Sequence, residues 1–431
     1  MIFNLSPIFG LVPLVIYIIL SFKDINPVLN VAISVILSAI LTKQPFSSFG
    51  GVLAESLGSF LGMIGFIIML GSGLGAILQK TGVAEYLVKS LMKKIGVNNE
   101  KKAILATMIS SMVLVSLLGT LAGANAIIAP IIIPLVAVIG ITPSTVATIF
   151  LGAGLTGMFV GPYTPQVVTI MGLTGLGYGQ YILEVGIPLA ILVLVITYIF
   201  ANRIQKKTKG IYAYENVEKV EEDYEAKQET KRATLAFILS MIALIVYGIT
   251  LQSGASYAIL VIVLSAIITG LVGKLKINDL IETFIKGSSR MMWLFIMFIL
   301  FNPFINFIAE AGSFEALVSL LKPLLKSQNK VIFSLVTTLT GIFGVGGAAT
   351  ADNIVMNNMF KLLVKDLSIS PSLWALILLV SGQITSFAYP EADMIGQMGL
   401  ARSKDMKNLV KYGITVTACS VILVMVRALF D

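Results

Sequence analysis

Three carboxylates lie beside interruptions in long apolar stretches of the chain. Asp352 ends a Gly-rich segment, GIFGVGGAATADN, and Glu391 and Asp393 follow the proline of SFAYPEADMIGQMG. A charge deep in an apolar environment is costly unless a cation, a proton or a water-filled cavity accompanies it. These residues therefore predict a site that carries a proton or contacts a cation, with Asp352 and Glu391 as candidate Na+ ligands. The alternative for Glu391 and Asp393 is an ordinary interfacial loop after Pro390.

Neutral polar residues surround the Gly-rich interruptions. Asn125 belongs to GTLAGANA in the first half of the chain, and Thr350 and Asn353 flank Asp352 in the second. Each of these side-chain oxygens lies where a new half-helix would begin. Because helix N-termini attract anions, the arrangement predicts a substrate- and ion-binding site. Tight helix contacts through small residues are the alternative, but they explain the glycines and not the carboxylate.

A Pro-rich interruption, FVGPYTPQ, adds two further candidates to the site, Thr164 and Gln166. It aligns with SFAYPEADMIGQMG, so that these two residues correspond to Glu391 and Asp393. The same positions are therefore neutral in one half of the chain and acidic in the other. A site assembled from both halves would be electrostatically asymmetric.

Covalent catalysis is not expected from this sequence. The chain has no histidine and a single cysteine, Cys419, which excludes a Ser-His-Asp arrangement, a metal-ligand spacing and an intrachain disulfide. Any proton that crosses the protein must use carboxylates, water or weaker groups. We therefore predict no enzyme activity and no cofactor beyond a coupling ion, H+ or Na+.

The elements that position these residues are apolar helices. Of 431 residues, 57% are hydrophobic and 12% charged, and the mean hydropathy is +0.95. Apolar runs approach the ~20 residues that a helix needs to cross a bilayer, and the first lacks the flanks of a cleavable signal. The candidate spans are Pro7–Phe22, Pro27–Leu41, Leu57–Leu78, Ile104–Leu121, Ala126–Ile139, Val146–Val160, Ile182–Ala201, Ala233–Leu251, Tyr257–Val272, Met291–Ile308, Val331–Val345, Ile354–Val364, Leu373–Phe387 and Ile414–Leu429.

One polar stretch divides the chain into two transmembrane regions. Residues 202–232 carry mixed charges and are too polar to enter lipid, so we predict a first region at 1–201, a cytoplasmic linker at 202–232 and a second region at 233–431. The net charge of +8 is explained by basic residues held on the cytoplasmic side. Nucleic-acid binding is therefore not expected.

The two regions share an order of motifs that indicates duplication. TGVAEYLVKSL from Thr81 matches AGSFEALVSLL from Ala311, and each is typical of an amphipathic arm. AGANAII then aligns with ATADNIV, and IMGLT with QMGLA. Basic residues are denser around the first arm than around the second, whereas they follow the second MGL and not the first. Equivalent loops would thus lie on opposite sides of the membrane, which predicts inverted repeats.

These segments resemble the ion-transporter superfamily, and GLGAILQKTGVAEYL, AGANAIIAP, GPYTPQ, AATADNIV and AYPEADMIGQMGL carry the resemblance. It implies an all-α polytopic membrane protein with two inverted repeats, each containing a re-entrant hairpin and an interrupted helix. Hairpin tips and interrupted helices would together form the substrate and cation site. Within the superfamily the chain is most similar to NhaC-type sodium/proton antiporters and their amino-acid-transporting relatives, with dicarboxylate and citrate carriers more distant. The serine-asparagine-threonine signatures of the dicarboxylate branch are absent, which weighs against a dicarboxylate substrate.

The expected function is secondary active transport in a bacterial inner (cytoplasmic) membrane. Na+ or H+ movement would be coupled to a small organic solute, an amino acid or an organic acid, and bilayer lipid would surround the protein. Plain Na+/H+ exchange is the first alternative, and a channel or membrane scaffold is the second. Related architectures are often dimers, so a homodimer is the assembly to test.

Overall fold

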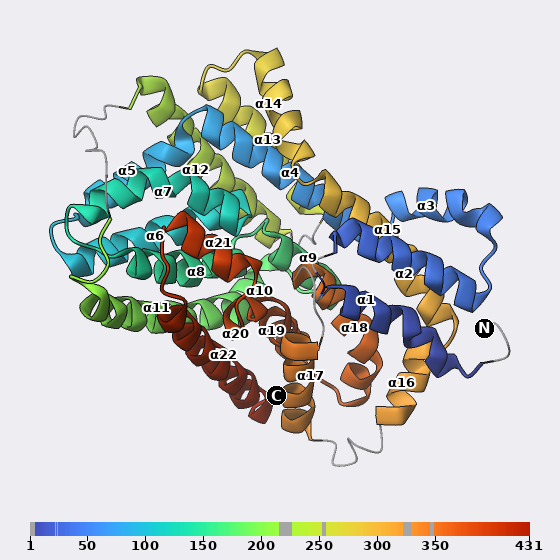
Figure 1. Ribbon diagram of the computed structural model, residues 1–431. Helices are drawn as coiled ribbons and strands as arrows, with labels where there is room; N and C mark the ends of the chain where they lie inside the picture. Colours follow the sequence, from blue (N-terminus) through green and yellow to red (C-terminus); the bar gives the residue numbers. More distant parts are fainter. Residues whose placement is uncertain are drawn as a thin grey trace.

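All regular structure in the described residues is helical (Figure 1). The computed structural model describes residues 5–21, 23, 25–214, 226–251, 256–321, 329–344 and 349–431. The expectation of an all-α chain is confirmed. The predicted Gly-rich break in the second half falls partly on residues 345–348, which lie outside the described residues.

The helices follow in chain order, with a linker between α11 and α12. In the first half they are η2 (Pro7–Leu11), α1 (Val12–Ser21), α2 (Pro27–Thr42), η3 (Phe46–Ser48), α3 (Phe49–Leu57), α4 (Phe60–Lys80), α5 (Val83–Ile95), α6 (Glu100–Leu118), α7 (Leu121–Ala137), α8 (Pro143–Val160), α9 (Pro165–Thr174), α10 (Tyr178–Tyr181), the π-helical turn η4 (Ile182–Gly186) and α11 (Ile187–Thr208). In the second half they are α12 (Gln228–Thr250), α13 (Tyr257–Val272), α14 (Ile277–Ser289), α15 (Met292–Glu310), α16 (Ser313–Leu321), α17 (Lys330–Gly344), α18 (Ala349–Asp366), α19 (Pro371–Gln383), α20 (Thr385–Ala388), α21 (Ala392–Leu400) and α22 (Met406–Leu429).

Helix length separates full spans from half-spans. Within the described residues, seven helices are long and apolar enough to cross a membrane, if α8 with α9 and α10 with α11 are counted as continuous. The other apolar helices have 10–17 residues, among them α7, α17 and α19. Since a span needs about 20 residues, these shorter helices suit hairpins and interrupted segments better than complete crossings.

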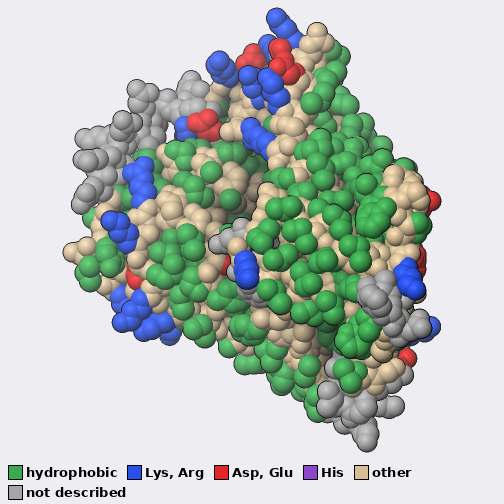
Figure 2. All heavy atoms as spheres, turned by 45° about the vertical axis from the view of Figure 1, so that its right-hand side comes forward, with side chains coloured by type: hydrophobic (Ala, Val, Ile, Leu, Met, Phe, Trp, Pro, Cys, Tyr) green, Lys and Arg blue, Asp and Glu red, His purple; other side chains and the backbone are tan. Residues whose placement is uncertain are grey.

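The helix surfaces show where lipid contacts the protein. Leu235, Leu239, Ile242 and Val246 recur at helical spacing along α12 and are all exposed. Figure 2 shows a broad hydrophobic face, with Lys and Arg side chains gathered toward its edges. A surface of this extent is typical of a protein whose solvent is the bilayer.

The two halves of the chain interleave. α4 packs against α13, α14 and α15, and α2 against α15, whereas α11 lies beside α22 and α8 beside α21 (Figure 1). The first helices of each half therefore form one group of packed elements, and the later helices form another. The broken helices α7, α9, α18 and α21 belong to the second group.

Close helix crossings depend on glycine at two positions of the first group. A Cβ on Gly73 of α4 would lie 2.4 Å from Oγ of Ser288, and one on Gly287 of α14 would lie 2.5 Å from Cβ of Ala76. The Ser72 hydroxyl donates to the Gly287 carbonyl at 2.8 Å across the same crossing. This contact fixes the C-terminal end of α14 against the middle of α4.

The two amphipathic arms begin in the same way. Gly82 precedes α5 with φ +75°, and Gly312 precedes α16 with φ +70°. Both glycines occupy the left-handed region that other residues rarely adopt, so each turns the chain sharply from a long helix into an arm. The motif match between the arms therefore extends to the backbone.

Helices extend into both ends of segment 202–232, for which a cytoplasmic linker stays a prediction. α11 continues to Thr208 and α12 begins at Gln228, so helices take both ends of the predicted segment 202–232. Lys206 and Lys207 lie in the last turn of α11, where basic side chains are favoured. Residues 215–225 of the predicted linker lie outside the described residues.

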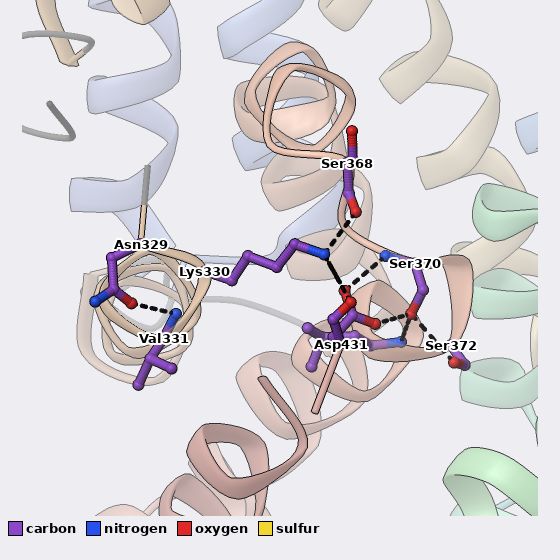
Figure 3. A network of polar contacts seen from close by, with 8 residues as sticks. Asn329, Lys330, Val331, Ser368, Ser370, Ser372 and Asp431 are labelled. Carbon is purple, nitrogen blue, oxygen red and sulfur yellow. Dashed lines mark hydrogen bonds and ion pairs between the residues drawn. The ribbon is translucent and has the colours of Figure 1, made fainter. Parts of the chain in front are cut away.

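A polar network ties three helix ends together on one side of the second half (Figure 3). The ammonium of Lys330, at the start of α17, donates to the Ser368 carbonyl at 2.9 Å and to Oδ2 of Asp431 at 3.0 Å. The hydroxyl and amide of Ser370, which caps α19, also donate to the Asp431 carboxylate. The network joins the beginnings of α17 and α19 to the chain just beyond α22.

Candidate functional site

Four helix N-termini open onto one cavity of about 450 Å3. The first residues of α7, α9, α18 and α21 are Leu121, Pro165, Ala349 and Ala392, and all of them line it. Backbone N–H groups at a helix start lack intrahelical partners and carry a partial positive charge. Four such ends directed at one space form a strong potential anion site.

Local sequence explains why the chain breaks at these points. α6 ends at Leu118, and Gly119 adopts φ +66°, which reverses the chain into α7. α9 starts with Pro165 at its first position, and the Thr164 hydroxyl accepts from the Val167 amide as its cap. Pro390 precedes α21. The breaks therefore follow from glycine freedom and from the missing N–H of proline.

Corresponding residues of the two interrupted helices occupy the same helical positions. Thr164 and Glu391 are the N-caps of α9 and α21, and Gln166 and Asp393 are the second residues of these helices. Thr164 caps its helix with its side chain, whereas Glu391 makes no such bond. The carboxylate of Glu391 lines the cavity together with Thr385 and Ser386.

The cavity wall holds two carboxylates with hydroxyl neighbours. Glu391 and Asp393 both line it and are half-buried. The Ser386 hydroxyl donates to Oδ2 of Asp393 at 2.8 Å, and Thr385 lines the same wall. A wall of carboxylate and hydroxyl oxygens suits a hard cation, an ammonium group or a proton.

Asp352 and Asn353 lie behind this wall in the first turns of α18. Asp352 is 1% exposed and Asn353 is 0% exposed, and neither carboxylate oxygen nor either amide atom has a hydrogen-bond partner within the described residues. Glu391 is near enough for its charge to act on Asp352. Burying a carboxylate without hydrogen-bond partners costs free energy, and a proton or a cation bound to Asp352 would offset this cost.

Other polar atoms without partners in the described part of the chain lie on the helices that pack around α18. They are Oε1 of Gln166 and Oγ1 of Thr169 on α9, the hydroxyls of Thr337 and Thr338 on α17, and Oγ of Ser381 and Oε1 of Gln383 on α19. Such atoms are normally satisfied in folded proteins. These unpartnered atoms are concentrated on α9, α17 and α19, so we expect water or an ion to bind in this region.

Two predicted site residues have structural partners instead. The Asn125 amide nitrogen donates to Oε1 of Gln397 at 2.7 Å and to the Phe150 carbonyl at 3.0 Å, and its oxygen accepts from Ser111 at 2.7 Å. Thr164 donates to the Met158 carbonyl at 2.8 Å. Both side chains are fully buried and do not line the cavity.

The cavity thus gathers half of the predicted site residues: Gln166, Thr350, Glu391 and Asp393. It also contains Thr120, Tyr163, Gln383, Thr385 and Ser386, which the motif analysis did not select. Their only sequence signal is proximity to a Gly or Pro break. No group of three or more acidic, histidine or cysteine side chains suited to a metal ion occurs among the described residues, and contact of Na+ with Asp352 or Glu391 stays a prediction.

Comparison with known proteins places this geometry among transporters. The family model of citrate transporters (CitMHS) matches residues 5–285. An uncharacterized membrane protein of Vibrio parahaemolyticus is 31% identical over 165 residues, which cover 36% of this chain and 37% of that protein. The chain therefore aligns with little more than a third of that relative's length.

Two solved structures share the fold. The YdaH transporter of Alcanivorax borkumensis superposes with a TM-score of 0.60 at 17% identity, covering 90% of this chain and 88% of that one. MtrF of Neisseria gonorrhoeae, described as illuminating a class of antimetabolite efflux pumps, has a TM-score of 0.60 at 12% identity, covering 94% of each chain. Because these sequence identities are low, the comparison shows only that the two structures and this chain share a fold.

The family match agrees with the expectation of a transport protein rather than an enzyme. It also selects the citrate carriers, which the sequence resemblance placed further away, while the resemblance to NhaC-type antiporters stays a prediction. Because the family model covers well over half of the sequence, the chain belongs to the citrate transporter (CitMHS) family, a family of multi-pass membrane proteins.

Proposed function

We propose that the protein is a secondary active transporter that couples H+ or Na+ to the movement of a small organic acid. The observation that carries the proposal is the convergence of four helix N-termini and two carboxylates on one cavity. The N-termini suit the carboxylate groups of a solute. The carboxylates Glu391 and Asp393 suit a cation, so the same space has a place for both partners.

Coupling follows from charge. An anionic solute that enters the cavity meets Glu391 and Asp393 and is repelled unless these charges are balanced. A proton or Na+ that binds beside them removes the repulsion, so solute and cation favour each other's binding. The bound cation thereby lowers the free energy of placing the anionic solute inside the membrane, and the solute does the same for the cation.

Asp352 is the residue that we expect to take the coupling ion. Its two oxygens have no partner in the described residues, and Asn353, Ser381 and Gln383 offer further unpartnered oxygens on α18 and α19. Gly382 allows the close contact, because its missing Cβ would lie 2.6 Å from Oδ1 of Asn353. Oxygen atoms of this kind are suitable ligands for Na+, and the carboxylate alone suffices for H+.

Plain Na+/H+ exchange is the second candidate, and the buried Asp352 favours it because such exchange needs a titratable group and no organic ligand.

An amino acid is the other solute to consider, with its ammonium group beside Glu391 and its carboxylate at the start of α7 or α18. Both candidates use the same cavity. They differ in what accumulates inside a vesicle.

Reconstitution in proteoliposomes tests the proposal. Labelled citrate, succinate and a set of amino acids would be supplied under an imposed Na+ gradient, an imposed pH gradient or neither. We expect a saturable carboxylate uptake that depends on one of the gradients. Na+-driven internal pH change without accumulation of any solute would replace the proposal with Na+/H+ exchange, and non-saturable flux that ignores the gradients would indicate a channel.

The wider arrangement is part of the proposal. We infer two inverted repeats, because arms, hairpins and interrupted helices follow in the same order in both halves, and a cytoplasmic linker in a bacterial inner membrane, because of the basic residues near it. A homodimer stays the assembly to test. Cysteine labelling from either side of sealed vesicles, at Lys209 and at Lys404 in the variant Cys419→Ser, would test the orientation, since both positions are predicted to be cytoplasmic.

A further inference from the structure

A second cavity of about 460 Å3 adjoins the central one. Both are lined by Ser72, Leu118 and Thr120, so the two spaces meet at the turn between α6 and α7. The second cavity then extends along α4 to Gln79, and the exposed Arg290 also lines it. It therefore connects an exposed basic residue with the central cavity, as an entrance to the site would.

One face of α7 forms the wall of this entrance. Gly123, Ala126, Ile127 and Pro130 are spaced for a single helix face, and all four line the second cavity. The buried Asn125 belongs to the other face. The N-terminus of the half-helix α7 therefore lies at the central cavity. The face of α7 with Gly123 and Ala126 lines the entrance, and these small side chains leave space there.

Among the described residues, Arg290 is the only charged side chain that lines the second cavity. It follows directly after α14, and the close crossing of Gly73 and Gly287 holds this end of α14 against α4. Within the described residues its guanidinium has no hydrogen bond and no ion pair. Its five donors are therefore available to an incoming ligand.

A third cavity, of about 620 Å3, is also lined by Arg290 and contains two further bases and two acids. Lys286 pairs with Glu282 at 2.5 Å, and this bond lowers the pKa of Glu282, so the pair stays ionised and neutral overall. Lys80 and Asp279 also line this cavity, so its two acids and its two lysines have equal formal charge. Arg290, which lines both the second and the third cavity, is the additional positive charge.

From this placement we propose that Arg290, with Gln79 and Thr120, forms an entry subsite for a carboxylate group of the transported anion. The proposal rests on the function proposed above and adds a binding step outside the central cavity. A guanidinium binds carboxylates through two parallel hydrogen bonds. The central cavity is acidic, so an anion needs a positive charge at its mouth to reach a useful local concentration.

Citrate binding to the purified full-length protein tests the subsite, measured by calorimetry at low and high salt. Arg290→Gln is expected to weaken citrate binding about tenfold, which corresponds to about 1.4 kcal/mol, and to flatten its salt dependence. Lys286→Gln is the matched control, since it removes a charge from an existing pair in the last turn of α14, just before Arg290, and it should leave citrate affinity within about twofold. Thermal unfolding would verify that both variants are folded.

Arg290→Lys keeps the test decisive if the glutamine variant does not fold. It retains the charge and loses the paired geometry, so binding about threefold weaker with wild-type salt dependence is expected. Wild-type citrate affinity and salt dependence in either variant would overturn the subsite while leaving the proposed function intact. A wild-type protein that neither binds nor transports citrate or any other carboxylate would overturn both.

Discussion

Asp352 differs from the other two carboxylates of the site in its surroundings. Glu391 and Asp393 line the cavity, and Asp393 accepts a hydrogen bond from Ser386, whereas Asp352 is buried with both oxygens unpartnered in the described part of the chain. A carboxylate in the first turn of a helix is favoured by the helix dipole, but its burial without partners is costly. We propose that Asp352 receives a ligand or a proton during function.

Neutralising this residue should therefore separate function from stability. Asp352→Asn is expected to reduce gradient-driven uptake at least about tenfold and to remove its dependence on the coupling ion, because the amide cannot take up a proton or balance a cation. The folded state should keep or gain thermal stability, since a buried charge without a partner is removed. Uptake and melting curves of purified protein would be compared, and wild-type uptake with unchanged pH dependence would exclude Asp352.

Asn125 and Asn353 offer a matched pair, since each is the fifth residue of its half-helix. Asn125 holds three partners on α6, α8 and α21, and Asn353 holds none within the described residues. Asn125→Ala should destabilise the protein by about 1–3 kcal/mol, because buried partners lose their bonds. Asn353→Ala should leave the unfolding temperature unchanged and impair uptake.

Thermal unfolding and uptake, measured on both asparagine variants, check this contrast. A reversed result, with Asn353→Ala unfolding early and Asn125→Ala transporting poorly while fully stable, would mean that the two half-helices have the opposite roles.

At the scale of elements, the contact between α18 and α19 positions the residues of the proposed ion site. The backbone of Gly382 approaches α18 so closely that a Cβ would lie 2.6 Å from Oδ1 of Asn353 and 2.7 Å from the Ala349 carbonyl. Contacts this short force displacement of the neighbouring backbone. The start of α18 would then move away from α19.

We expect Gly382→Ala to abolish most uptake while the protein still inserts and folds, because the displacement acts at the cavity. Gly396→Ala in α21 is the control, since no atom of the described residues lies within 4 Å of its added Cβ. Uptake in vesicles, normalised to the amount of folded protein, distinguishes the two. Equal uptake of both variants would show that the close contact between α18 and α19 is not needed for transport.

At the scale of the whole molecule, the network of Lys330, Ser370 and Asp431 connects elements that are far apart in sequence (Figure 3). Burial raises the pKa of Asp431, but hydrogen bonds from Ser370 and Lys330 outweigh burial and hold its pKa below the usual value. A carboxylate with a lowered pKa stabilises the folded state above its unfolded pKa. This contribution is lost as pH falls through the folded pKa.

Asp431→Asn should accordingly lower the free energy of unfolding by about 1–2 kcal/mol at pH 7, because Lys330 loses its ion pair. The difference between variant and wild type should shrink as the pH falls below about 4, the range in which an ordinary aspartate is protonated. Melting curves from pH 7 to pH 3 would measure it. A double-mutant cycle with Lys330→Met isolates the pair, and additive effects would contradict direct coupling.

The interleaving of the two halves is also a property of the whole molecule. α4 packs between helices of the second half, and α22 packs on α11. Each half thus needs the other to complete its packing, and the cavity takes walls from α4, α7 and α9 as well as from α18 and α21. An asymmetric site, neutral on one side and acidic on the other, results from this arrangement.

The sequence by itself determined the helices and most of the places where they break. The run Tyr257–Val272 is α13 with the same bounds, and the breaks before Leu121, Pro165 and Ala392 follow from nearby glycine and proline. Hydropathy and backbone freedom are local properties, so a local pattern suffices to predict them. The predicted boundaries differ from the observed ones where a capping residue starts a new helix. The predicted span Leu57–Leu78 is divided because Ser59 caps a helix that begins at Phe60.

Only the tertiary structure decided which polar atoms have hydrogen-bond partners and which have none within the described residues. Asn125 and Asn353 look equivalent in sequence, yet Asn125 is bonded to Gln397, 272 residues away, and Asn353 has no described partner. The place of Arg290 on the cavity that α7 also lines depends equally on contacts between distant segments. Hydrogen bonding and cavity shape arise from packing across the whole chain, which no local pattern of residues encodes.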